Sequence, residues 1–151
     1  MRIVVQRVSR ARVLVEGRVT GEIERGLLVL VGVGRADTAD DVRYIAGKIR
    51  DMRVFDGEQG RPNDRSVVEV GGGVLLVSQF TLYGDLRRGR RPSFDQAAPP
   101  QLARGLYDDL VRELRTAMTP VATGEFQALM HVELVGDGPV TIVLDSRERQ
   151  A

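Results

Sequence analysis

The residues best suited to chemistry stand together in the run Ser78, Gln79, Phe80 and Thr81. They follow an apolar stretch that begins at Val74, and a hydroxyl or amide buried in such surroundings costs free energy unless it is hydrogen-bonded. One interpretation is a core strand over residues 74–82 whose side chains alternate between the two faces of a sheet. The other is a strand end that lines a pocket and offers hydroxyls and backbone N–H groups to a ligand.

A second unusual run is Gly138-Pro139-Val140-Thr141. Glycine and proline punctuate loops, so residues 136–139 predict a hairpin turn between two strands. The alternative is a Gly138-Pro139 bond held in the cis form, which occurs in about 5–6% of X–Pro bonds in folded proteins. The two carbonyl groups would then point in a shared direction and form a rigid wall that carries no side chain.

Two features of the composition exclude much of the usual catalytic chemistry. The chain has no cysteine, which excludes thiol nucleophiles and thiolate metal sites. Its one histidine, His131, excludes a multi-histidine zinc site within one chain and is the only residue that could complete a Ser-His-Asp triad. On an alternating strand over residues 125–134, this side chain is more typical of surface or packing than of a base. We therefore expect an enzyme with no metal, no cofactor and no conventional nucleophile–base pair.

The charges are balanced overall but clustered locally. The formal net charge is +1, and Arg87, Arg88, Arg90 and Arg91 surround Gly89 in a predicted loop over residues 83–99. Such a run is either a solvated loop or a site that holds phosphate groups. The chain has no apolar run near 18 residues, and its start reaches charge too soon for a signal peptide, so we expect a cytoplasmic protein.

The hydrophobic periodicity predicts one α+β domain over residues 1–151, with two principal helices and a mainly antiparallel, barrel-like sheet. One helix starts at Asp37-Thr38 and the other covers residues 101–118, where Leu102, Leu106, Leu110 and Leu114 recur every four residues. Glu16-Gly17 is typical of a hairpin turn. The predicted strands after this first hairpin cover residues 27–33, 53–55, 74–82, 124–135 and 140–144.

In their order and spacing, these segments resemble the D-aminoacyl-tRNA deacylase family. The pairing of Ser78-Gln79-Phe80-Thr81 with the later Gly138-Pro139-Val140-Thr141 is the most specific part of the likeness, which runs nearly end to end. The chain departs from the family pattern at Gly136, where Asn is general, and at Gln127, Leu129 and His131, where Gly, Asp and Gln are common. The other matching segments are residues 1–8, 26–33, 48–50, 89–94 and 124–126.

The resemblance implies a homodimeric hydrolase that frees tRNA from D-amino acids, and from glycine, as a proofreading step of translation. It implies that the Gly-Pro unit of each subunit enters the active site of the other and rejects L-amino acids. It assigns catalytic roles to Ser78, Gln79, Phe80 and Thr81. It also implies substrate binding by Gly138, Pro139, Arg7 and Met130.

The residues leave both the mechanism and the class of function open. The ribose 2′-hydroxyl of the substrate could activate the attacking water while backbone N–H groups near Phe80 and Thr81 stabilise the oxyanion. Alternatively, Thr81 is a covalent nucleophile and His131 its base. The rival functions are a non-catalytic RNA-binding module and an editing domain that acts on L-aminoacyl-tRNA.

Overall fold

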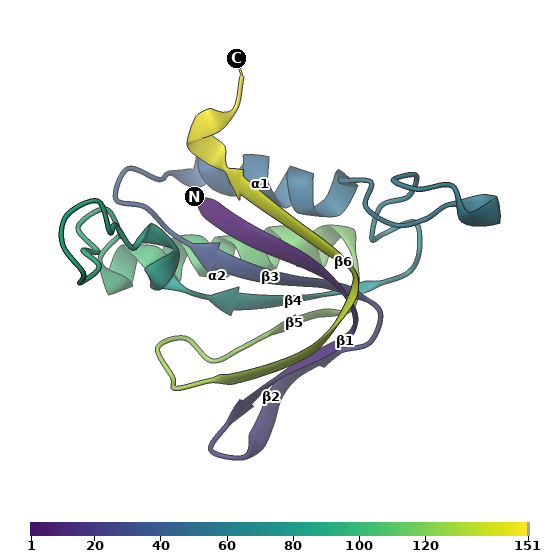
Figure 1. The fold of residues 1–151 in the computed structure, drawn as a ribbon, viewed down its shortest axis with the longest axis horizontal. Coiled ribbons are helices and arrows are strands. Elements are labelled where there is room, and N and C mark those ends of the chain that lie inside the picture. Colours follow the sequence, from purple (N-terminus) through teal and green to yellow (C-terminus); the bar gives the residue numbers. More distant parts are fainter. Residues whose placement is uncertain (151) are drawn as a thin grey trace.

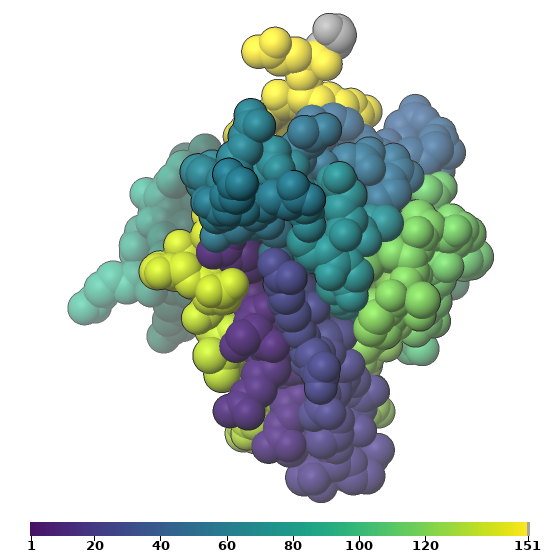
Figure 2. Space-filling view, turned by 90° about the vertical axis from the view of Figure 1, so that its right-hand side faces the viewer, coloured from purple at the N-terminus to yellow at the C-terminus, as the bar shows by residue number. Residues whose placement is uncertain are grey.

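A long first strand organises the sheet, because it pairs with three others. In the computed structural model, which describes residues 1–150, β1 (Arg2–Val15) pairs antiparallel with β3 (Gly26–Gly32) over its first half and with β2 (Arg18–Ile23) over its second half. Its other edge pairs antiparallel with β6 (His131–Asp145). The space-filling view shows β1 lying between β6 and β2 (Figure 2).

The other edge of β3 continues the sheet in parallel. β3 pairs with β4 (Gly73–Ser78), and β4 pairs with β5 (Val121–Thr123), so the three strands lie side by side (Figure 1). Parallel neighbours need crossover connections, and the two long helices lie in them: α1 (Ala39–Asp51) before β4 and α2 (Pro100–Ala117) before β5. The predicted α+β class, with two principal helices and a mainly antiparallel sheet, is confirmed.

The sheet curls until β2 approaches β5 and is nearly closed into a barrel, as predicted. The approach is so close that a Cβ atom on Gly21 would overlap the carbonyl oxygen of Thr123. A small apolar cluster fills the curled half, and Met130 and Val132 pack against it. Its buried members are Val8, Ala11, Val13, Val15, Ile23, Leu28, Leu75 and Val77.

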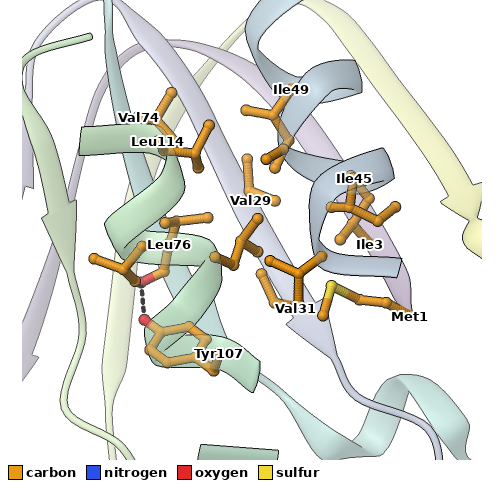
Figure 3. Packing of buried hydrophobic residues seen from close by; sticks show 14 of the residues in the cluster. Met1, Ile3, Val29, Val31, Ile45, Ile49, Val74, Leu76, Tyr107 and Leu114 are labelled. Carbon is orange, nitrogen blue, oxygen red and sulfur yellow. Dashed lines mark hydrogen bonds between the residues drawn. The ribbon is translucent and has the colours of Figure 1, made fainter. Parts of the chain in front are cut away.

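The larger core lies between the two long helices and the face of the sheet that they cover (Figure 3). Thr38 caps α1, and Asp41 completes a capping box, so this helix begins one residue after the predicted Asp37-Thr38 start. In α2, Leu106, Leu110 and Leu114 are buried as their spacing predicts, whereas Leu102 in the first turn is exposed. The buried Tyr107 hydroxyl donates a hydrogen bond of 2.9 Å to the Leu76 carbonyl (Figure 3).

Some local expectations are confirmed and one is wrong. Glu16 and Gly17 form the β1–β2 turn, with φ angles of 51° and 76°. The strand predicted over residues 53–55 does not form, because Phe55 makes only an isolated bridge with Arg65 at the base of a loop that contains the short turn η1 (Glu58–Gly60). β6 is followed by a 3-10 turn, η3 (Ser146–Glu148). None of the helices formed by residues 1–150 has the length and hydropathy needed to cross a membrane.

Candidate active site

One pocket, with a volume of about 570 Å³, brings together five of the eight site residues expected from the sequence. These five are Ser78, Gln79, Phe80, Thr81 and Met130. The end of β4, the start of α2 and the loop before β6 surround the pocket, so its walls come from segments that are distant in the sequence. The remaining lining residues are Val33, Phe94, Ala97, Ala98, Pro100, Ala103, Phe126, Gln127 and Ala128.

The backbone changes direction at the point where the polar residues begin. β4 ends at Ser78, and residues 80–83 form a 3-10 turn, η2 (Phe80–Tyr83), so the strand predicted over residues 74–82 is too long. The Gln79 N–H still donates to the Val31 carbonyl at 2.7 Å, and beyond that bond the β3–β4 ladder stops. The alternating interpretation therefore fails after Ser78, and the run bends round the pocket.

This bend leaves backbone donors at the pocket. The first N–H groups of a helical turn have no partner within the turn, and in η2 these belong to Phe80 and Thr81. The later hydrogen bonds of the turn run from the Leu82 N–H to Gln79 and from the Gly84 N–H to Thr81. The Gln79 side-chain amide donates to the Thr81 hydroxyl at 3.0 Å, which orders the two polar side chains.

Within residues 1–150, the pocket lining contains no ionisable side chain. Its polar side chains are the hydroxyls of Ser78 and Thr81 and the amides of Gln79 and Gln127. His131 is the first residue of β6 and is exposed, and it is absent from the lining although its neighbour Met130 is present. The geometry thus supplies Thr81 with an amide neighbour and no base.

The loop before β6 contributes a wall that the sequence did not predict. A strand was expected over residues 124–135, but β5 ends at Thr123 and β6 begins at His131. Between them the chain bends through Gln127, which has a φ of 63°, and this bend directs Phe126 and Ala128 to the pocket. Phe94 completes the rim, with its ring edge-on to Phe80 at a centroid distance of 5.0 Å. Phe94 and Phe126 lie in segments that carried the resemblance, which is the one sequence signal for them.

The other three expected residues lie together outside this pocket. The Gly138-Pro139 bond is cis, but the hairpin turn predicted at residues 136–139 is wrong, because β6 runs unbroken through this region with register shifts opposite Val8. Gly138 and Pro139 are exposed. Arg7 donates to the Asp137 carbonyl at 3.1 Å and to the Val54 carbonyl at 2.6 Å, so its guanidinium fixes the chain directly before Gly138.

The four clustered arginines form a loop beside the pocket, which we call the arginine loop (residues 85–93). Paired backbone hydrogen bonds of 2.8 and 2.9 Å between Asp85 and Ser93 close its base. Hydrogen bonds from Arg87 lower the pKa of the Asp85 carboxyl to about 2. Arg88, Arg90 and Arg91 are exposed, and none of them makes an ion pair within residues 1–150.

Comparisons with known proteins point to one family. The profile of the family described as D-Tyr-tRNA(Tyr) deacylase matches residues 4–145. The D-aminoacyl-tRNA deacylase of Koribacter versatilis is 60% identical over 148 residues, which is 98% of this chain and 99% of that protein. The D-aminoacyl-tRNA deacylase of Thermosipho africanus is 52% identical over the same share of both chains.

Solved structures agree with the fold. A protein named c-Myc DNA Unwinding Element Binding Protein superposes with a TM-score of 0.92 at 39% identity, covering 96% of this chain and 98% of that one. A probable eukaryotic D-amino acid tRNA deacylase superposes with a TM-score of 0.82 over 95% of this chain and 97% of that one. The latter is only 18% identical, so it supports the fold alone.

Proposed function

The chain belongs to the D-Tyr-tRNA(Tyr) deacylase family, and we propose that it hydrolyses the ester between a D-amino acid and the 3′-terminal ribose of tRNA. The observation that carries this proposal is a pocket which offers backbone N–H groups and hydroxyls but no ionisable side chain. Such a pocket suits a reaction whose nucleophile is water and whose main need is stabilisation of an oxyanion. The products are a free D-amino acid and tRNA, in the cytoplasm where translation takes place.

In the proposed reaction, a water oxygen attacks the ester carbonyl and a tetrahedral oxyanion forms. The N–H groups of Phe80 and Thr81 stabilise that charge, since preorganised donors act most strongly where charge develops. The neighbouring 2′-hydroxyl of the ribose accepts a proton from the water and at the same time passes its own proton to the departing 3′-oxygen as the carbon–oxygen bond breaks. This substrate-assisted route is favoured over a Thr81 nucleophile, because the pocket holds no base that could activate the hydroxyl.

Chirality is judged, in this proposal, by the backbone of a second copy of the chain. Gly138 and Pro139 are exposed on β6 and do not line the pocket of their own chain. Apolar side chains on the same strand are also exposed, including Val143 at 68%, which suits a face covered by another subunit. In a homodimer the Gly138 and Pro139 carbonyls would close the partner's pocket and leave room for hydrogen alone on the L side of the α-carbon. Glycine has no side chain to collide with this wall, so glycyl-tRNA would also be a substrate.

Subunit mixing tests the shared pocket directly. We expect Gly138→Ala to impair the wall and Ala97→Trp to fill the pocket, so each variant alone is inactive. When the two are coexpressed, a mixed dimer retains one open pocket faced by one intact Gly138. Recovery of about a quarter of wild-type activity supports a pocket shared between subunits, since half of a random mixture is heterodimer with one working site. No recovery, or full activity of a monomer, contradicts it.

We propose that the phosphate groups of the tRNA bind to the arginine loop. Phe94 follows the loop directly and lies on the pocket rim, so an RNA chain whose end enters the pocket passes the exposed guanidiniums of Arg88, Arg90 and Arg91. Guanidinium groups bind phosphate oxygens in bidentate geometry. A competition experiment tests this assignment. Displacement of aminoacyl-tRNA by single-stranded DNA would indicate general phosphate binding, whereas no displacement would indicate that binding also requires the aminoacyl ester.

The decisive experiment compares matched D- and L-tyrosyl-tRNA as substrates of the purified protein. We expect release of D-tyrosine and little release of L-tyrosine. Binding without hydrolysis of either substrate would favour an RNA-binding module. Preferential hydrolysis of the L-ester would favour an editing domain and would contradict the chiral wall.

A further inference from the structure

We infer that Arg2 is a positioning residue, whose guanidinium holds the turn η2 in the conformation that the hydrolysis needs. The inference rests on the proposed function, since η2 supplies the oxyanion donors in that reaction. Arg2 is absent from the lining of the pocket. Its effect must therefore pass through the residues that it contacts.

The turn has few supports of its own. It contains four residues, and 3-10 turns of this length have poor hydrogen-bond geometry and little intrinsic stability. Phe80 and Thr81 are exposed, and Tyr83 is the only buried residue of η2. The start of the turn is tied to the sheet through the Gln79 N–H, so the position of the donors depends on what holds the other end.

Arg2 contacts both residues at that other end. Its Nη1 donates to the Leu82 carbonyl at 2.9 Å, and its guanidinium carbon lies 4.7 Å from the centroid of the Tyr83 ring. A charged donor makes a stronger hydrogen bond than a neutral one, and a guanidinium over an aromatic face adds a cation–π attraction. Arg2 and Tyr83 line a separate groove that shares no residue with the pocket, so the turn is held from its outer side.

Two glycines, one at the end of β3 and one just beyond it, show how closely the turn is seated. A Cβ atom on Gly32 would lie 3.0 Å from the Leu82 Cβ and 3.2 Å from the Tyr83 ring, and one on Gly34 would lie 2.8 Å from the Tyr83 hydroxyl. The Tyr83 hydroxyl is buried and has no hydrogen-bond partner within residues 1–150. The ring is therefore located by packing against these glycines and by Arg2, and by no hydrogen bond of its own.

The guanidinium is itself fixed in place. Asp145 accepts from Nε at 3.1 Å, and its side chain is largely buried. Arg2 and Asp145 are register partners where β1 pairs with β6, so the sheet sets their separation. With Nε directed to Asp145 and Nη1 to Leu82, the planar group spans β6 and η2, which a lysine ammonium on a flexible stem cannot reproduce.

The test compares Arg2→Met and Arg2→Lys with Arg112→Met, a control that removes an exposed arginine paired with Asp109 on α2. We expect kcat for D-tyrosyl-tRNA to fall about tenfold to a hundredfold in Arg2→Met, because small displacements of catalytic groups have effects of this size. Arg2→Lys should lose less, KM should change little in both variants, and Arg112→Met should match the wild type. An unchanged kcat in Arg2→Met, or an equal loss in Arg112→Met, overturns the inference.

Amide hydrogen exchange provides a readout that does not depend on activity. We expect faster exchange of the peptide covering residues 79–84 in Arg2→Met, with unchanged exchange in β4. Unchanged exchange of residues 79–84, or faster exchange without loss of kcat, contradicts the positioning role. If the wild-type protein fails to hydrolyse D-tyrosyl-tRNA, the proposed function is wrong, and the exchange result still decides whether Arg2 orders the turn.

Discussion

The pocket and the arginine loop adjoin at Phe94 and differ in almost every property. The pocket is lined by apolar side chains, hydroxyls and amides, and the N–H groups of Phe80 and Thr81 have no partner within the turn that borders it. The loop is exposed and carries four guanidiniums within five residues, only one of which is paired with the loop's own carboxylate. In the proposed function, this difference corresponds to a division of labour: the backbone performs and restricts the reaction, while side-chain charge holds the substrate.

This division explains how a chain without cysteine and with one exposed histidine can catalyse hydrolysis. Donors fixed by the fold need no proton transfer before the reaction, and a neutral pocket lets them act without competing charges. Phosphate binding tolerates solvent and needs charge in quantity. The two regions should therefore respond in opposite ways to substitution, and backbone changes should have the larger effect.

The largest expected effect comes from adding a methyl group to the proposed wall. Gly138 has a φ of 128°, which L side chains rarely adopt, and a Cβ there would lie 2.9 Å from the Val140 backbone nitrogen and 3.3 Å from Arg7 Nη2. We expect Gly138→Ala to lower kcat for D-tyrosyl-tRNA about a hundredfold, because the wall is displaced by part of an ångström. Steady-state kinetics at saturating substrate measures this.

Gly136→Ala is the matched control, two residues earlier on the same strand. A Cβ on Gly136 would meet no atom within 4 Å, and its φ lies outside the left-handed region. Its kcat should stay within about twofold of the wild type, because the added methyl group displaces no neighbouring atom of the chain and requires no strained φ. Equal losses in the two variants would mean that β6 tolerates no substitution here and would remove the argument for a specific wall.

The next effect in size concerns the arginine loop. Replacing Arg88, Arg90 and Arg91 with Ala should raise KM about thirtyfold and reduce the slope of log affinity against log salt by about 2, since each contact with single-stranded phosphate contributes about 0.7. Arg87→Ala should have a smaller effect, because Arg87 is already paired with Asp85. Filter binding across a salt series checks both expectations. A fall in kcat with unchanged KM would contradict the division between the two regions.

How far the sequence predicted these two regions depends on which interactions form them. The amphipathic spacing in 101–118 and the apolar run at 27–33 predicted α2 and β3, because local pattern and burial agree there. The turn at Phe80 was missed, since Phe, Thr and Tyr favour strands and nothing local marks the end of the β3–β4 ladder at Gln79. The end of the ladder is set by the tertiary structure and not by the local sequence.

The reverse error occurred at Gly136–Pro139. Gly, Asp and Pro favour turns, yet β6 continues through them. The residues of β6 before and after this segment both pair with β1, and this pairing is long enough to absorb the register shifts. The same distinction between local pattern and tertiary structure applies to the site residues. The Ser78–Thr81 run was visible from unusual polarity, whereas Phe94, Phe126 and Ala103 reach the pocket only through the path of the chain.

A smaller effect is expected from the Thr81 hydroxyl, which is the nucleophile of the covalent alternative. Thr81→Ala should lower kcat less than about tenfold, because the Thr81 backbone N–H remains and only the hydrogen bond from Gln79 is lost. Loss of a true nucleophile removes several orders of magnitude of rate. Rapid quenching followed by mass spectrometry should detect no acyl-enzyme. A trapped ester on Thr81 would show that the pocket works through a side chain after all.

The smallest expected effect is the response of the two regions to pH. A bell-shaped rate profile reports the pKa values of an essential acid and base, and the pocket lining contains neither. In the loop, hydrogen bonds from Arg87 lower the pKa of Asp85 from 3.8 to about 2, so this pair stays charged at higher pH and is lost only as pH falls toward 2. Arginines remain protonated throughout the physiological range.

After allowance for the titration of the substrate's own amino group, kcat should therefore be constant between about pH 6 and 8, where ordinary carboxylates are already ionised and arginines still charged. KM should be equally flat, because the Asp85–Arg87 pair does not titrate in this range. His131→Gln provides the control, and an inflection in the wild-type pH profile of kcat that disappears in this variant would identify His131 as a base and restore the covalent route through Thr81.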